Sequence, residues 1–112
     1  MEVQERDIQY YVKDNGICPV KDWLKELKDV IGRAKIDVRI RRAGLGNLGD
    51  HKSVGDNIIE LRIPFGPGYR IYLSIVGNGN IILLLVAGNK STQQNDIIKA
   101  KEFLLDWRCH EK

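Results

Sequence analysis

The chain has 112 residues, of which 43% are hydrophobic and 29% are charged, and its formal net charge is +3. These values predict one globular domain over residues 1–112 and exclude a mainly disordered chain. The longest apolar run, Ile81–Ala87, is far shorter than the ~18 residues of a membrane span. The N-terminus lacks the basic and apolar blocks of a signal peptide, so we expect a cytoplasmic protein without a membrane partner.

The N-terminal half predicts a strand followed by two helices. Alternating apolar residues predict the strand over residues 6–13. Apolar residues at three- and four-residue spacing then predict an amphipathic helix over 19–29. We expect Gly32 to end this helix and a second helix to span 33–43, so that the two form a helical hairpin.

The second predicted helix is strongly basic. Residues 32–70 contain 8 basic and 4 acidic residues, a net of +4, and most of this excess lies in residues 33–42. Within that block Lys35, Arg39 and Arg42 share one helical face. They are candidates for contacts with RNA phosphates, although a solvated helix face has the same pattern.

The C-terminal half predicts three antiparallel strands, over residues 57–65, 69–76 and 81–87. The last strand is apolar on both faces and is therefore expected to be the most buried. A final helix is predicted over 92–107, with Ser91 and Gln94 as a capping box. The order strand, helix, helix, three strands, helix indicates an α+β domain with an antiparallel sheet.

Polar residues share one face of the first predicted hairpin. A loop over residues 66–68 places Arg62 opposite Tyr72, with Glu60 and Arg70 on the same face. In one interpretation Glu60 pairs with an arginine on a solvated face. In the other, the arginines bind phosphate and Tyr72 stacks on a base. Unpaired charges cannot be buried, so we expect this face to be open or covered by groups that supply acceptors.

The chain contains no standard catalytic or metal-binding motif. Cys18 and Cys109 lie near opposite ends, without the spacing of metal ligands, and we expect both to be reduced. The two histidines, His51 and His110, match no metalloenzyme or hydrolase motif. We therefore expect neither a metal nor a small-molecule cofactor.

Most of the chain, about residues 8–107, resembles a known family. It closely resembles the RelE/HigB-like toxin superfamily, above all the branch of phage-derived addiction-module killer proteins. The motifs that carry the resemblance are Glu60-Leu61-Arg62, Phe65-Gly66-Pro67-Gly68-Tyr69-Arg70-Ile71-Tyr72, Gly88-Asn89-Lys90-Ser91-Thr92-Gln93-Gln94 and Asp96-Ile97.

This resemblance implies a RelE-like α+β fold and the toxin component of a type II toxin–antitoxin system. Similar toxins are mostly ribosome-dependent mRNA endonucleases, and their partners are a helix-turn-helix antitoxin, the ribosome and mRNA. Two alternatives follow from the same resemblance. ParE-like toxins share the fold but inhibit DNA gyrase, and an inactive relative acts only together with its antitoxin.

The resemblance also assigns expected roles to individual residues. Arg70 matches the arginine that holds the scissile phosphate, and Lys90 falls at a basic position of the family. Arg62 and Glu60 occupy positions where cleaving relatives often carry basic residues, so the acid at Glu60 is a departure. Asp96 lies where many relatives carry a tyrosine or a histidine.

RNA cleavage in this superfamily uses the ribose 2′-hydroxyl as the nucleophile. We expect Arg70 and Arg62 to stabilise the charged phosphorane and Lys90 to assist the leaving group. Asp96 or Glu60 is expected to accept the proton of the 2′-hydroxyl. His110 is a further candidate for this role if the C-terminal tail folds back.

Overall fold

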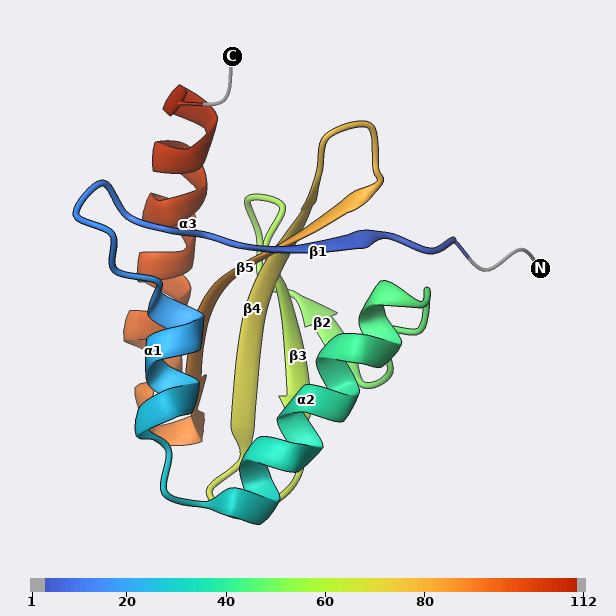
Figure 1. Cartoon of the computed structure of the whole chain (residues 1–112), viewed down its shortest axis with the longest axis vertical. Coiled ribbons are helices and arrows are strands. Elements are labelled where there is room, and N and C mark those ends of the chain that lie inside the picture. Colours follow the sequence, from blue (N-terminus) through green and yellow to red (C-terminus); the bar gives the residue numbers. More distant parts are fainter. Residues whose placement is uncertain (1–3, 111–112) are drawn as a thin grey trace.

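The computed structural model describes residues 4–110 of the chain (Figure 1). These residues confirm the predicted α+β class. The elements in chain order are β1 (Asp7–Tyr10), α1 (Pro19–Glu26), α2 (Val30–Gly44), β2 (His51–Ser53), β3 (Ile59–Ile63), β4 (Tyr69–Val76), β5 (Ile81–Asn89), the 3₁₀ helix η1 (Lys90–Thr92) and α3 (Gln93–His110). None of the helices in this part of the chain is long and apolar enough to cross a membrane.

The strands form one mixed sheet in the order β1-β5-β4-β3-β2. β2 to β5 are antiparallel to their neighbours, but β1 runs parallel to β5. The prediction of a purely antiparallel sheet is therefore wrong at β1, because alternation within a strand does not specify its partner. β2 was not predicted, since its three residues are all exposed and carry no apolar pattern. The prediction that β5 is the most buried strand is confirmed along most of its length.

The break between the first two helices lies earlier than the glycine that was expected to cause it. α1 ends at Glu26, and Asp29 caps α2 by accepting a hydrogen bond from the Gly32 N–H at 2.9 Å. Gly32 is therefore inside α2. A Cβ at this position would collide with the side chains of Asp29 and Tyr69, so the glycine permits close packing of α2 against β4.

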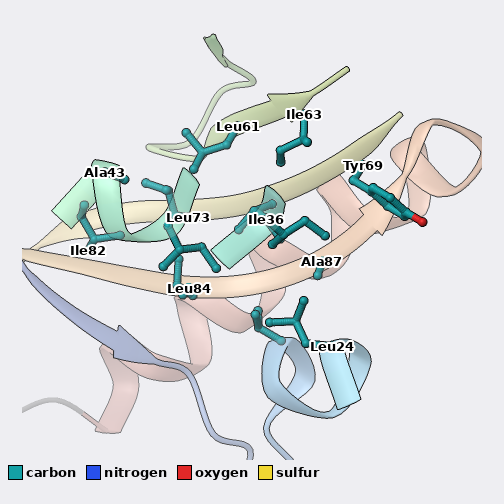
Figure 2. Close-up of a cluster of buried hydrophobic side chains, with 13 residues drawn as sticks. Leu24, Ile36, Ala43, Leu61, Ile63, Tyr69, Leu73, Ile82, Leu84 and Ala87 are labelled. Atoms are coloured by element: carbon teal, nitrogen blue, oxygen red, sulfur yellow. The ribbon is translucent and has the colours of Figure 1, made fainter. Parts of the chain in front are cut away.

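Helices cover both faces of the sheet. On one face α1 packs against β5 and α2 lies over β3, while α3 packs against β4 and β5 on the other face (Figure 1). Figure 2 shows the cluster on the first face, in which both helices meet the sheet through buried side chains. Its members include Leu24, Ile36, Ala43, Leu61, Leu73, Ile82, Leu84 and Ala87. The second cluster, beneath α3, includes Ile58, Tyr72, Leu83, Leu85, Ala100 and Leu104.

The β3–β4 hairpin differs from the predicted register by two residues. Arg62 lies directly opposite Arg70, and Glu60 lies opposite Tyr72. The connecting loop is longer than predicted because β3 ends before Pro64, which has no N–H to donate to the ladder. A slip of two residues leaves side chains on the same face, so the four polar side chains are still neighbours.

Candidate functional site

Glu60 is at the centre of this polar face, and its side chain is fully buried. Its Oε1 accepts a hydrogen bond from the Nε of Arg62 at 2.8 Å. Its Oε2 accepts hydrogen bonds from the Tyr72 hydroxyl at 2.9 Å and from the Nε2 of Gln93 at 2.8 Å. The Nε of Arg70 lies 3.6 Å from the same oxygen. The carboxylate is therefore hydrogen-bonded to Arg62 and forms a longer ion pair with Arg70.

These contacts keep Glu60 ionised. Burial raises the pKa of Glu60, but hydrogen bonds from Arg62, Gln93 and Tyr72, together with the charge of Arg70, outweigh burial and lower it overall. Burial and the bond to Glu60 raise the pKa of Tyr72 far above its ordinary value. The tyrosine hydroxyl is thus a permanent donor, and the carboxylate a poor proton acceptor at neutral pH.

Arg70 retains unused hydrogen-bonding capacity. Its side chain is 14% exposed, and its Nη1 donates to the Gly68 carbonyl oxygen at 2.9 Å. Its Nε is buried without a hydrogen-bond partner among residues 4–110. Lys90 is exposed and lies beside the same glycine. A Cβ on Gly68 would be 3.1 Å from Arg70 Nη1 and 3.5 Å from Lys90 Cβ. The cationic side chains of Arg70 and Lys90 thus both lie beside Gly68, near the same position. A buried donor without a partner is uncommon in folded proteins, and a bound ligand is one explanation for it.

Asp96 lies on the same side of the sheet, above the strand partner of Arg70. Gly88 pairs with Arg70 across the β4–β5 ladder, and a Cβ on Gly88 would overlap the Asp96 carboxylate. Thr92 donates a hydrogen bond from its Oγ1 to Asp96 Oδ2 at 2.5 Å. Burial raises the pKa of Asp96, against the opposing effects of Thr92 and of the charge on Lys99. Of the two carboxylates, Asp96 is therefore the more easily protonated.

The turn from β5 into α3 brings Gln93 to Glu60. The predicted capping box at Ser91 is displaced, because Asn89 caps this turn by accepting a hydrogen bond from the Ser91 N–H at 2.9 Å. The Asn89 N–H donates to Thr92 Oγ1 at 3.2 Å in return. Sequence reasoning did not identify Gln93 as a site residue. An uncharged amide carries no strong signal, and its place in the Gly88–Gln94 motif was the only pointer.

The expected face is only partly open. The structure brings Glu60, Arg62, Arg70 and Tyr72 together, as predicted, but the side chains of Glu60 and Tyr72 have no exposed surface. Tyr72 belongs to the core beneath α3, so its ring is not available to stack on a base. Arg62 remains 35% exposed. Glu60 therefore pairs with both arginines, and the outer edges of these arginines reach the surface. The pairing agrees with the first interpretation drawn from the sequence, while the binding of phosphate stays a prediction.

The three candidate RNA-binding residues of α2, Lys35, Arg39 and Arg42, do not belong to this polar face. Arg39 donates through Nη1 to the Arg62 carbonyl oxygen and through Nη2 to the carbonyl oxygens of Leu48 and Asp50, both at 2.9 Å. Its guanidinium is therefore used within the fold. Lys35 and Arg42 are exposed, with Lys35 Nζ 5.0 Å from the centre of the Phe65 ring. These three residues border a groove with Ile63, whose side chain is on the sheet face opposite Arg62.

His110 lies at the far end of α3 from the polar face. The helix continues without a break from Gln93 to His110, about 25 Å at 1.5 Å per residue. His110 Nδ1 lies 2.8 Å from the Asp106 carbonyl oxygen. His110 was a candidate only if the tail folds back to the site, and this condition is not met in the described residues.

A group of possible metal ligands surrounds His110. Among the described residues, Asp14, Asp106 and His110 are the group whose ligand atoms all lie within 4.8 Å of one another. His110 Nε2 is 3.8 Å from Asp14, and its Nδ1 is 3.5 Å from the Asp106 carboxylate. Asp106 also accepts a hydrogen bond from the Tyr11 hydroxyl at 2.5 Å. These polar contacts account for the arrangement without a bound ion.

Comparison with known proteins gives one informative match. A protein of Haemophilus influenzae, named "Uncharacterized protein", is 53% identical to this chain over 79 residues. The matched region covers 70% of this chain and 79% of that protein. No protein-family model matches the chain. No solved structure matches it.

Proposed function

The chain belongs to the same family as that Haemophilus influenzae protein, and we propose that it is the toxin component of a type II toxin–antitoxin system. In this proposal it acts in the cytoplasm as a ribosome-dependent mRNA endonuclease, with a helix-turn-helix antitoxin as its inhibitor. The motifs similar to RelE/HigB-like toxins support it. The observation that carries it is the pair Arg62 and Arg70, directly opposite each other, with a buried Arg70 Nε that lacks a hydrogen-bond partner in the described structure.

The arrangement suits cleavage by an internal nucleophile. The ribose 2′-oxygen attacks the neighbouring phosphorus, a charged phosphorane forms, and the bond to the 5′-oxygen breaks. Arg70 and the exposed edge of Arg62 stabilise the phosphorane by charge-assisted hydrogen bonds. Lys90, which lies beside Gly68 together with Arg70, stabilises the charge that develops on the 5′-oxygen.

The two carboxylates take different roles in this mechanism. The three hydrogen bonds to Glu60 and its lowered pKa make it a positioning residue that holds Arg62 and Arg70. Asp96 has a raised pKa, and its carboxylate lies against Gly88, the residue that pairs with Arg70 across the β4–β5 ladder. We therefore assign the acceptance of the 2′-hydroxyl proton to Asp96 rather than to Glu60.

The experiment that tests this function is controlled expression followed by mapping of mRNA 5′ ends. We expect growth arrest and new 5′ ends within translated codons. Arg70→Ala should remove both effects, while Arg108→Ala, an exposed arginine in the last turn of α3, should retain them. Folding of each variant is checked by circular dichroism. Intact mRNA and normal growth with the folded wild-type chain would refute the proposal.

A second candidate function is inhibition of DNA gyrase by a ParE-like toxin. It is favoured by the carboxylate of Glu60, which already contacts both Arg62 and Arg70 and lowers their attraction for a phosphate. Purified protein in a DNA supercoiling assay distinguishes this function. Inhibition at stoichiometric protein, with mRNA left intact in cells, would replace the nuclease proposal by this one.

A further inference from the structure

Helix α2 carries a second apolar stripe besides the one that it buries. Ile36 and Ile40 face the core, but Ile31, Ala34 and Val38 follow one another at three- and four-residue spacing on another side of the helix. Ile31 is 63% exposed and Val38 is 37% exposed. A surface helix usually carries one apolar stripe, which it buries against the core. The second stripe of α2 is not covered by other residues of the described structure.

The exposed stripe forms one wall of a groove. The end of β3 and the loop after it form the other wall, and the groove encloses about 500 Å³. Six of the residues that line it are apolar: Ile31, Ala34, Val38, Ile63, Pro64 and Phe65. This apolar lining is therefore suited to apolar side chains of a partner rather than to phosphate groups.

The remaining lining residues are all cationic. They are Lys35, Arg39 and Arg42, and none of the acidic residues among positions 4–110 lines the groove. Arg39 is fixed by its hydrogen bonds to main-chain carbonyl oxygens, whereas Lys35 and Arg42 are exposed. An occupant must therefore combine an apolar surface with negative charges along its sides.

We propose that this groove binds an amphipathic helix of a protein partner, with an apolar stripe flanked by glutamates or aspartates. Such a helix places side chains at i, i+3, i+4 and i+7 in an apolar groove. Its acidic flanks then meet Lys35 and Arg42. Since Ile63 and Arg62 project to opposite faces of β3, an occupied groove leaves the Arg62–Arg70 face uncovered. The proposal therefore does not rest on the nuclease function.

The test uses the purified full chain and a fluorescent designed peptide, with leucines at i, i+3, i+4 and i+7 and glutamates on both flanks. Fluorescence anisotropy should show saturable binding that weakens with added salt. Ile31→Glu should weaken binding roughly ten- to a hundredfold, because it places a charge in the apolar lining of the groove. Lys35→Glu combined with Arg42→Glu should also weaken it, by repelling the acidic flanks.

The matched control is Val30→Glu. Val30 is next to Ile31 and 68% exposed, but it does not line the groove, so binding should be unchanged. Both substitutions place an acid in the first turn of α2, where it favours the helix, so neither should unfold the chain. Equal binding by the Ile31→Glu and Val30→Glu variants would overturn the proposal.

Three further outcomes also count against it. The same peptide with lysines in place of glutamates should not bind, and equal binding would show that charge plays no part. A single-stranded RNA that binds through Lys35 and Arg42 and displaces the peptide would identify the groove as an RNA surface. A dimer in light scattering that dissociates on Ile31→Glu would identify a second copy of the chain as the occupant.

Discussion

Arg62 and Arg70 stand directly opposite each other in the β3–β4 ladder, with the carboxylate of Glu60 in contact with both. Like charges at opposed positions of an antiparallel pair destabilise a sheet. Here the destabilisation is offset by one buried acid, which also accepts hydrogen bonds from Tyr72 and Gln93. The stability of the hairpin and the placement of the cationic site therefore depend on the same residue.

Replacement of Glu60 by glutamine tests this dependence. Glu60→Gln preserves the size of the side chain but leaves two opposed arginines without a counter-charge. We expect the free energy of unfolding to fall by about 2 kcal/mol at neutral pH, since Arg62 is partly solvated and the loss is smaller than for a wholly buried pair. Urea denaturation of both proteins measures the difference.

The pH dependence of this difference has a defined sign. The pKa of Glu60 is lower in the folded chain than its ordinary value of 4.5. Its charge therefore stabilises the fold fully above that value, and the contribution is lost as the pH falls through the folded pKa. The wild type and Glu60→Gln should thus converge in stability in acid. A difference independent of pH would contradict an ionic role for Glu60.

Gly88 is expected to tolerate no side chain. Gly88→Ala places a methyl group where the Asp96 carboxylate lies, so α3 must shift away from β5. We expect a loss of about 2 kcal/mol or more, typical of overpacking at a buried position. The double variant Gly88→Ala with Asp96→Ala removes the nearer obstacle but leaves Thr92 Oγ1 at 2.6 Å, so it should recover part of the loss, measured by thermal denaturation. No recovery in the double variant would indicate that another contact of Gly88 is responsible.

Two arginines of α2 should respond differently to the same substitution. Arg39→Ala removes hydrogen bonds to three main-chain carbonyl oxygens and should lower the free energy of unfolding by about 2–3 kcal/mol. Arg39→Lys should recover little, because an ammonium group cannot reproduce the planar fork of donors. Arg42→Ala, at an exposed position of the same helix, is the control and should leave stability nearly unchanged. Equal effects of Arg39→Ala and Arg42→Ala in urea denaturation would disprove the structural role of Arg39.

Asp96→Asn separates a chemical role from a structural one. Burial raises the pKa of Asp96, so its charge is unfavourable to the fold above that pKa, and the neutral amide should be tolerated or mildly stabilising at neutral pH. If Asp96 accepts the 2′-hydroxyl proton, RNA cleavage should fall by about 10²–10⁴-fold and lose its acid limb. Single-turnover cleavage between about pH 4 and pH 8 measures both effects. Full activity in a stable Asp96→Asn protein would remove Asp96 from the mechanism.

Strong periodic patterns predicted most of the fold. The apolar alternation of β3 and β4 and the double-sided apolar run of β5 identified three strands and the α+β class. The same alternation placed Glu60, Arg62, Arg70 and Tyr72 on one face, even though the register was two residues out. Side-chain period determines the face, whereas the length of the loop determines the register, and the effect of Pro64 on that length was missed.

Other features depend on contacts that local sequence does not contain. β1 pairs in parallel with β5, and α3 packs over Tyr72. Both contacts bring together segments that are far apart in the sequence. A glycine usually indicates a helix break, but Gly32 lies inside α2, where the ring of Tyr69 from β4 packs against it. An irregular register opposite Tyr72 places Leu85 and Val86 in the same core cluster, which strict alternation does not predict.

The parallel pairing of β1 with β5 has a consequence for the order in which the chain folds. The polar face and the groups around it come from residues 60–96, which are joined by two hairpins and one tight turn. β1 instead pairs Asp7–Tyr10 with Ile81–Leu84, which are far apart along the chain, at a larger cost in loop-closure entropy. We expect β1 to dock last and to open first, so that its amides exchange with solvent before those of β4. Each opening exposes one edge of β5, the most apolar strand, and an exposed edge can pair with a strand of another chain. The docked β1 therefore protects the protein against self-association.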